Sequence, residues 1–262
     1  MHHSTRLVVI CLCGLFLAGC AHTKTQIPQA HSENQRLAAA KSLYEKAHKE
    51  LKAEHFKQAL KQYNTLEDNY PFTRYAVQAQ LDSIYAHYRS NDPDVAIAEA
   101  KQFIKEHPTY PDLDYVYYIK GLVNFQRSAK EGHSLLPIDE ARRDMQYTRQ
   151  AFEDFGVLIQ KFPKSQYAHD ARQRMIFLRN RLARHDLLVA KYYMKRGAWI
   201  AANRRAQRIL THYQGTDAMP EALVIMVRSY NKLGLKKAAA DTRKILAANF
   251  PAFAKEHKSE LD

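Results

Sequence analysis

The sequence predicts an all-α protein in which pairs of helices stack into a right-handed superhelical solenoid. The chain of 262 residues contains only 8 glycines and 9 prolines, which is few for a protein built of sheets and turns. Hydrophobic residues make up 46% and charged residues 26%, so a packed core is expected and extensive disorder is not. The most informative observation is an internal repeat, because self-similarity at a period of about 20 to 50 residues is typical of stacked arrays.

The first 19 residues form a predicted export signal. Arg6 supplies a positive charge, and the apolar stretch 7–16 is too short to cross a bilayer as a stable helix. The stretch runs into Leu-Ala-Gly-Cys at 17–20, which resembles the lipobox of bacterial lipoproteins. We therefore predict cleavage before Cys20 and acylation of its thiol, since two or more acyl chains anchor a protein stably. The alternative is an ordinary cleaved signal with an incidental cysteine.

The remaining cysteines and the next residues agree with a lipid anchor. Cys11 and Cys13 lie in the removed segment, so the mature chain can form neither an internal disulfide nor a cysteine metal site. Ala21 follows Cys20 in place of aspartate, which is the pattern of outer-membrane destination in enteric lipoproteins. We expect an outer-membrane anchor facing the periplasm, and we interpret 20–35 as the lipidated cysteine and a flexible polar tether.

Five segments of the mature chain share an alanine, further apolar positions and an aromatic or histidine stop, usually before proline. The shared residues are Ala59, Ala96, Ala151, Ala202 and Ala239, with spacings of 37, 55, 51 and 37. They match the second helix of a tetratricopeptide repeat of about 34 residues, where alanine permits a close helix crossing and proline ends the helix. We predict about five such repeats, whose stacking gives one continuous core and a concave binding surface. A generic helical bundle with chance spacing is the alternative.

Two of these spacings exceed the repeat length and indicate insertions. The first lies at 127–147, where Gly132 and Pro137 indicate a long loop or a short helix. The second lies within 166–195, which contains neither glycine nor proline and is expected to extend one helix. We divide the mature chain into N-terminal repeats 1–3 at 36–163, C-terminal repeats 4–5 at 164–254, and a tail at 255–262.

The chain carries no recognisable catalytic or metal-binding motif. None of the 13 histidines belongs to an HExxH sequence, and neither a glycine-rich phosphate loop nor a GxSxG elbow is present. Asp112 and Asp114 flank a turn and are expected to cap the helix that starts near Tyr115, rather than to act as an acid pair. We expect a protein that is not an enzyme and has no cofactor and no metal.

Positive charge is concentrated in the C-terminal part. Residues 1–163 contain 20 Lys and Arg against 19 Asp and Glu, whereas residues 164–262 contain 20 against 8. A basic surface attracts nucleic acid, anionic lipid or an acidic protein face. Because export makes nucleic acid a poor partner, we favour an acidic protein face, followed by lipopolysaccharide or phospholipid head groups. A basic face that is merely solvated is the third possibility.

Two blocks of the repeat region are more specific than a general tetratricopeptide match. They are DYVYYIKGL at 114–122 and YYMKRGAWIAANR at 192–204. These blocks resemble the BamD (ComL) family, lipoproteins of the outer-membrane β-barrel assembly machinery, and the resemblance covers about residues 36–250. It implies a non-enzymatic subunit whose C-terminal repeats bind the periplasmic POTRA domain of a BamA-like barrel subunit. It also implies that the N-terminal repeats receive the C-terminal signal of unfolded outer-membrane proteins and dock companion lipoproteins of the BamC or BamE kind.

The resemblance and the repeat geometry assign candidate binding residues. Arg205 matches the family arginine that pairs with an acidic POTRA residue, and the neighbouring Arg204 and Arg208 leave open which guanidinium makes the contact. The first-helix residues expected to face the N-terminal groove are Tyr44, His48, Tyr85, Tyr88, Arg89, Tyr115 and Tyr118. Tyrosine combines ring area with a hydroxyl, and Arg89 is suited to a terminal carboxylate. The alternative for the groove is that about half of these tyrosines only pack between helices. The alternative for the function is a different periplasmic repeat lipoprotein that scaffolds peptidoglycan or cell-division machinery.

Overall fold

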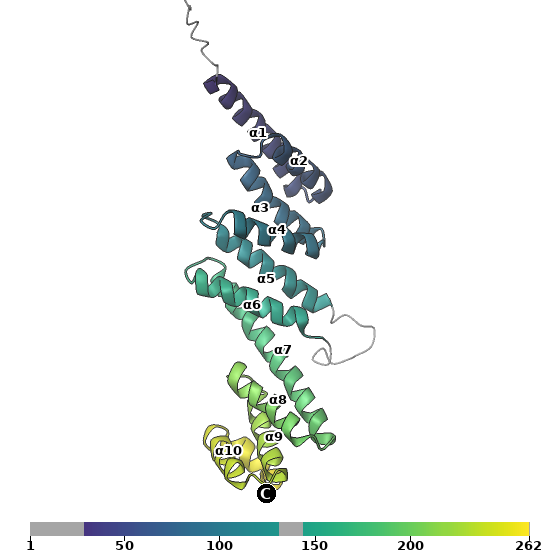
Figure 1. The fold of residues 1–262 in the computed structure, drawn as a ribbon, viewed down its shortest axis with the longest axis vertical. Helices are drawn as coiled ribbons and strands as arrows, with labels where there is room; N and C mark the ends of the chain where they lie inside the picture. Colours follow the sequence, from purple (N-terminus) through teal and green to yellow (C-terminus); the bar gives the residue numbers. More distant parts are fainter. Residues whose placement is uncertain (1–28, 131–143, 262) are drawn as a thin grey trace, which may run out of the picture.

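A computed structural model describes residues 29–130 and 144–261 of the chain. Within these ranges it contains twelve helices and no strand, which confirms the predicted all-α class. Ten helices form five consecutive pairs: α1 (Gln29–Lys52) with α2 (Phe56–Asn69), α3 (Arg74–Arg89) with α4 (Pro93–Glu106), α5 (Leu113–Lys130) with α6 (Gln146–Lys161), α7 (Ala168–Lys195) with α8 (Trp199–His212), and α9 (Met219–Lys232) with α10 (Lys236–Asn249). The pairs stack in sequence order into an elongated solenoid (Figure 1). The predicted signal, Cys20, and the Gly132 and Pro137 part of the first insertion lie outside the described residues.

The second helix of every pair has the same packing and the same end. The five alanines expected at close helix crossings are buried, with at most 2% of their surface exposed: Ala59, Ala96, Ala151, Ala202 and Ala239. The residues that follow these helices have φ between −137° and −124°, and each donates its N–H to the carbonyl four residues earlier: Tyr70, His107, Phe162, Tyr213 and Phe250. Tyr213 keeps this geometry although glutamine follows it, so a proline at the next position is not required to end α8.

The hydrophobic core runs along the stack as four connected clusters. One lies in α1–α3, the next in α3–α7, a third in α6–α9, and the last joins α9 and α10 to the chain end. Side chains at the boundaries contact two clusters at once: Tyr85 joins the first two, Phe152 the second and third, and Tyr230 the last two. Each pair therefore buries its apolar face against its neighbours, as expected for a repeat solenoid.

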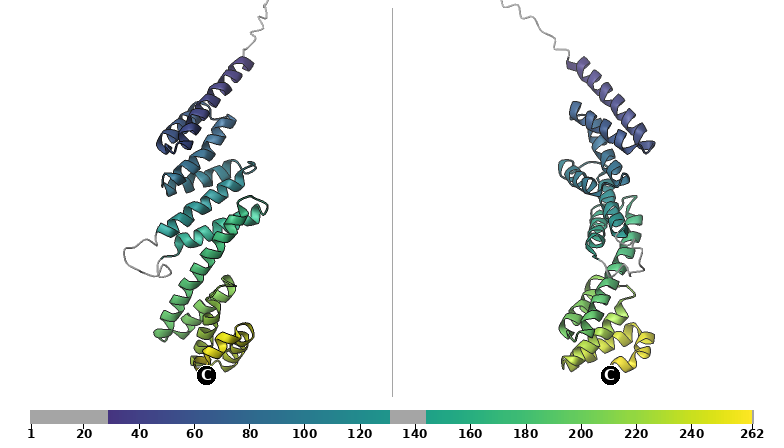
Figure 2. Two further views of the ribbon diagram at one scale, coloured as in Figure 1. Left: turned by 180° about the vertical axis from the view of Figure 1, so that it is seen from behind. Right: turned by 90° about the vertical axis from the view of Figure 1, so that its right-hand side faces the viewer.

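Two segments are more ordered than the sequence indicated. Residues 29–35, assigned to the tether, belong to α1, because this glycine- and proline-free stretch extends a helix that packing has already nucleated. The predicted tail at 255–262 contains the end of α11 (Pro251–Glu256) and all of α12 (Lys258–Leu261), and Leu261 is buried in the last cluster. By contrast, α7 has the expected length, because its 28 residues cover nearly all of the predicted range 166–195. It runs from the pairs before it to the last two pairs of the solenoid (Figure 2).

Candidate functional site

The arginines predicted for docking line one hollow at the start of α8, which we call the arginine hollow. Its volume is about 640 Å³, and its lining includes Trp199, Ile200, Leu233, Arg204, Arg205 and Arg208. Ile200 is an exposed apolar side chain, with 58% of its surface accessible. Gly197, with φ +69°, forms the turn that leads into Trp199, a backbone conformation that favours glycine. The hollow therefore combines cationic and apolar surface.

A buried carboxylate on α7 holds two of the three guanidinium groups. The Asp186 side chain is only 1% exposed; its Oδ1 lies 3.0 Å from Arg205 Nη1, and its Oδ2 lies 3.3 Å from Arg208 Nε. Burial opposes the charged form of Arg208, but the charge of Asp186 and the hydrogen bond with Tyr213 together outweigh this effect and raise the pKa of that guanidinium. Arg204 is exposed, and no carboxylate of the described residues lies within ion-pair distance of it.

The ion pair with Asp186 bears on the predicted docking role of Arg205. The Arg205 side chain is 36% exposed and already has a carboxylate partner within the chain. Sequence reasoning missed Asp186, although its position offered a hint. It follows the buried Leu182 and Ala183 at helical spacing, so it falls on the apolar face of α7, where a carboxylate needs a cationic partner.

The predicted N-terminal residues partly converge on a pocket between α1, α3 and α5, which we call the groove pocket. Its volume is about 290 Å³, and it is lined by His48, Tyr85, Arg89 and Tyr115 among others. Four of the seven predicted groove residues thus share one concavity. Tyr44, Tyr88 and Tyr118 are not part of its lining.

Asp82 on α3 organises one wall of the groove pocket. Its Oδ2 accepts hydrogen bonds from Tyr44 Oη at 2.9 Å and Tyr63 Oη at 3.0 Å, and it lies 3.1 Å from His48 Nδ1. Burial, followed by the nearby carboxylate, raises the pKa of both tyrosine hydroxyls. The Tyr44 hydroxyl is therefore committed to Asp82, an interaction across α1 and α3 that the sequence did not indicate.

Arg89 is held at the opposite edge of the groove pocket. Its Nη1 donates to Tyr85 Oη at 2.6 Å, and its Nη2 donates to Glu54 Oε1 at 2.5 Å. These two hydrogen bonds raise the pKa of Arg89, with Tyr85 the larger cause. Glu54 lies in the turn between α1 and α2 with φ 60°, and its side chain is 63% exposed. A ligand carboxylate would therefore compete with Glu54 for this guanidinium.

The remaining tyrosines pack between helix pairs. Tyr118 stacks on Tyr167 with ring centroids 4.6 Å apart and donates to Asp170 Oδ2 at 2.7 Å. Burial, and then Asp170, raises the pKa of Tyr118 to about 12. Tyr88 lies beside Tyr85 of the same helix, with ring centroids 6.4 Å apart, and packs against the core cluster of α3–α7. These contacts agree with the alternative that part of the tyrosine set serves packing.

In 29–130 and 144–261, no group of three or more His, Cys, Asp or Glu residues is arranged to hold a metal ion. The sequence predicts that Asp112 and Asp114 cap a helix starting near Tyr115, but α5 begins at Leu113, so Asp114 lies in its first turn. Its Oδ1 accepts only the N–H of the next residue, Tyr115, at 2.9 Å, which is not the contact of an N-cap side chain. No helix in the same ranges is long and apolar enough to cross a membrane.

The fold defines a helical-repeat protein with two concave surfaces. The family model of the YfiO outer membrane lipoproteins matches residues 36–246. The outer membrane protein assembly factor BamD of Neisseria meningitidis serogroup A is 41% identical over 238 residues, which cover 91% of this chain and 88% of the relative. The protein of the same name from Vibrio cholerae is 35% identical over 233 residues, covering 89% and 93% of the two chains. The chain therefore belongs to this outer membrane lipoprotein family, the BamD family.

Proposed function

We propose that the protein is a lipoprotein of the outer membrane that supports the assembly of outer-membrane proteins by binding them, without catalysis. Its family membership and the assembly-factor name of its relatives support this proposal. The lipobox-like sequence at 17–20 supports anchoring through acylated Cys20, facing the periplasm. Cys20→Ala should abolish labelling with a fatty-acid probe, because the lipobox-like sequence then lacks the thiol that takes the acyl chains. Label retained on the variant would contradict the anchor.

The arginine hollow is the proposed docking surface for the periplasmic POTRA domain of a BamA-like barrel subunit. One observation carries this assignment: buried Asp186 fixes two guanidiniums beside the exposed Ile200. Fixed arginines next to apolar side chains are typical of interface hot spots, because little side-chain entropy is lost on binding. Arg204 adds an exposed charge at the same rim, so an acidic face is the complementary partner.

The test uses the purified lipoprotein in detergent micelles and the isolated POTRA domain. Arg204→Glu and Ile200→Asp should each weaken binding about tenfold or more, a loss of about 1.4 kcal/mol. Arg172→Glu, an exposed basic residue near the start of α7, is the matched control and should bind normally. Circular dichroism should be unchanged for all three variants. Normal binding by both Arg204→Glu and Ile200→Asp would exclude the hollow as the docking surface.

The groove pocket is the proposed receptor for the C-terminal segment of an unfolded outer-membrane protein. Tyr85 and Tyr115 offer ring area, and Arg89 offers a guanidinium for the terminal carboxylate. A client peptide with a free C-terminus should bind more tightly than its amidated form, and Arg89→Met should remove the difference. Equal binding of the two peptides to the unaltered protein would refute this role. We further propose that companion lipoproteins of the BamC or BamE kind dock on the N-terminal repeats.

A further inference from the structure

Another small pocket lies between α2 and α4, the second helices of the first two pairs. It is on the opposite side of α3 from the groove pocket. Its volume is about 110 Å³, which is room for several water molecules. We call it the acidic pocket, and its lining includes Glu67 of α2, Gln80 and Ser83 of α3, and Glu99, Phe103 and Glu106 of α4. At about 3.6 residues per helical turn, Gln80 and Ser83 fall on the face of α3 opposite Tyr85 and Arg89.

The lining concentrates negative charge that no Lys or Arg of the pocket compensates. Glu67, Glu99 and Glu106 contribute three carboxyl groups from two helices. Burial raises the pKa of Glu67; a hydrogen bond from Gln80 opposes this effect, and the neighbouring Glu99, Asp68 and Glu106 add to it. Neighbouring carboxylates repel one another, and a cation that enters between them relieves this repulsion.

Two buried acceptors in the acidic pocket have no donor. Ser83 is 3% exposed, and neither its Oγ nor the buried Glu99 Oε2 has a hydrogen-bond partner among the described residues. The other oxygen of Glu99 lies 3.4 Å from His87 Nε2. Because the great majority of buried polar atoms are hydrogen-bonded, two unpaired oxygens facing one space indicate that a donor binds there.

The geometry favours a planar organic cation over a metal ion. The described carboxylates include no group of three that is arranged to hold a metal. A guanidinium spans a wider set of acceptors, since its five N–H groups form a fixed planar fork. Phe103 adds an aromatic ring to the lining, which suits guanidinium stacking. An ammonium group lacks both the fork and the flat face.

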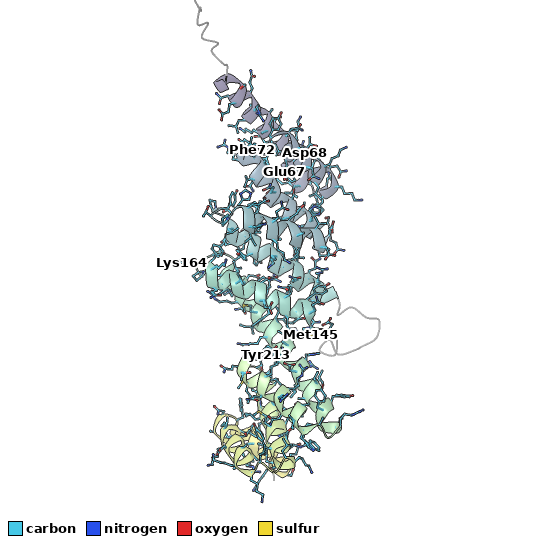
Figure 3. All side chains as sticks on the ribbon, viewed as in Figure 1. Glu67, Asp68, Phe72, Met145, Lys164 and Tyr213 are labelled. Carbon is cyan, nitrogen blue, oxygen red and sulfur yellow. The ribbon has the colours of Figure 1, made fainter. Side chains whose placement is uncertain are left out.

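The surroundings favour a side chain of a protein over a free small molecule. Phe72 projects from the turn after α2 and is 97% exposed, although it is a large apolar residue. Figure 3 shows Phe72, Asp68 and Glu67 at the same end of α2. We propose that the acidic pocket binds the guanidinium of an arginine in a partner protein, with Glu99 and Ser83 as acceptors and Phe72 in contact with an adjoining apolar residue of the partner.

The test uses nuclear magnetic resonance of the full protein in detergent micelles. The probes are N-acetyl-arginine amide, the corresponding citrulline amide, which is neutral, and the corresponding lysine amide, which carries an ammonium group. Calcium chloride and the dipeptide amide acetyl-Arg-Leu are the other two probes. The arginine amide should shift the Ser83 and Glu99 amide signals saturably, and the dipeptide should bind at least threefold more tightly. Glu99→Gln and Ser83→Ala should each weaken arginine-amide binding about fivefold. Glu45→Gln, an exposed carboxylate of α1, is the control and should bind normally.

Each alternative ligand gives a distinct result. Citrulline or lysine amide binding as well as arginine amide would overturn the guanidinium assignment, and so would calcium producing the same shifts. Phe72→Ala should remove the advantage of the dipeptide and leave the arginine amide unaffected. A dipeptide that binds no better than the amide would overturn the assignment to a protein partner. Thermal melting by circular dichroism verifies that each variant is folded.

Discussion

The sharing of Asp186 by two arginines makes a quantitative prediction about stability. The carboxylate is 1% exposed, whereas the side chains of Arg205 and Arg208 are 36% and 37% exposed. Removing one arginine leaves the carboxylate with the other, so each single alanine substitution should cost only about 1 kcal/mol after allowance for solvent screening. Removing both leaves a buried charge without compensation, which costs about 3–5 kcal/mol. The double substitution should therefore exceed the sum of the singles by at least 1 kcal/mol.

Urea unfolding followed by fluorescence measures these differences, because Trp199 is the only tryptophan and lies in the same hollow. Adding Asp186→Asn to the double substitution should recover most of the loss, since no charge then remains buried. Substitutions that simply add, within about 0.5 kcal/mol, would mean that the two arginines do not share the carboxylate. A failure of Asp186→Asn to rescue the double variant would refute the reasoning as well.

Three further predictions follow from other contacts. Gly121→Ala should destabilise the fold by about 1–3 kcal/mol in thermal unfolding, because the new Cβ would lie 2.5 Å from the buried ring of Phe155. The pKa of His87 is raised chiefly by its hydrogen bond with Glu99, against the opposing effect of burial. Its contribution to the free energy of unfolding should be full below its unfolded pKa of about 6.5 and be lost as the pH rises through the folded pKa. Glu54→Gln should strengthen binding of a client peptide with a free C-terminus, because that peptide no longer competes with a carboxylate for Arg89.

Matched controls separate these effects from general damage. Gly156→Ala should be neutral or stabilising, since its added Cβ would meet only Met175 Cε at 3.6 Å. Equal melting temperatures for the two glycine variants would contradict the close packing of α5 on α6. His87→Gln should flatten the pH dependence of stability, and an unchanged profile would exclude His87 as its source. Glu54→Gln should not alter the binding of an amidated peptide.

The features predicted from sequence are those that depend on local pattern. The repeat alanines and the stop residues were identifiable because helix crossing and helix termination constrain residue type at fixed spacing. The length of α7 followed from the absence of glycine and proline. The helical spacing indicates that Asp186 lies on an apolar face, but the partners of Asp82 and Asp186 were not predicted. Each network joins side chains from different helices, 19 residues apart in the case of Asp186 and Arg205. The start of α1 was missed because polar composition was taken as a sign of disorder.

The length of α7 separates the helices that pack on its start from the arginine hollow at its end. Near its first turn, Asp170 accepts the Tyr118 hydroxyl from α5, and near its last turn Tyr193 lines the arginine hollow. Its 28 residues span about 42 Å at a rise of about 1.5 Å per residue. An extended chain covers at most about 3.6 Å per residue, so a partner segment that contacts both ends of this helix needs about a dozen residues. The helix thus acts as a spacer that keeps the proposed docking surface for the POTRA domain away from the N-terminal repeats.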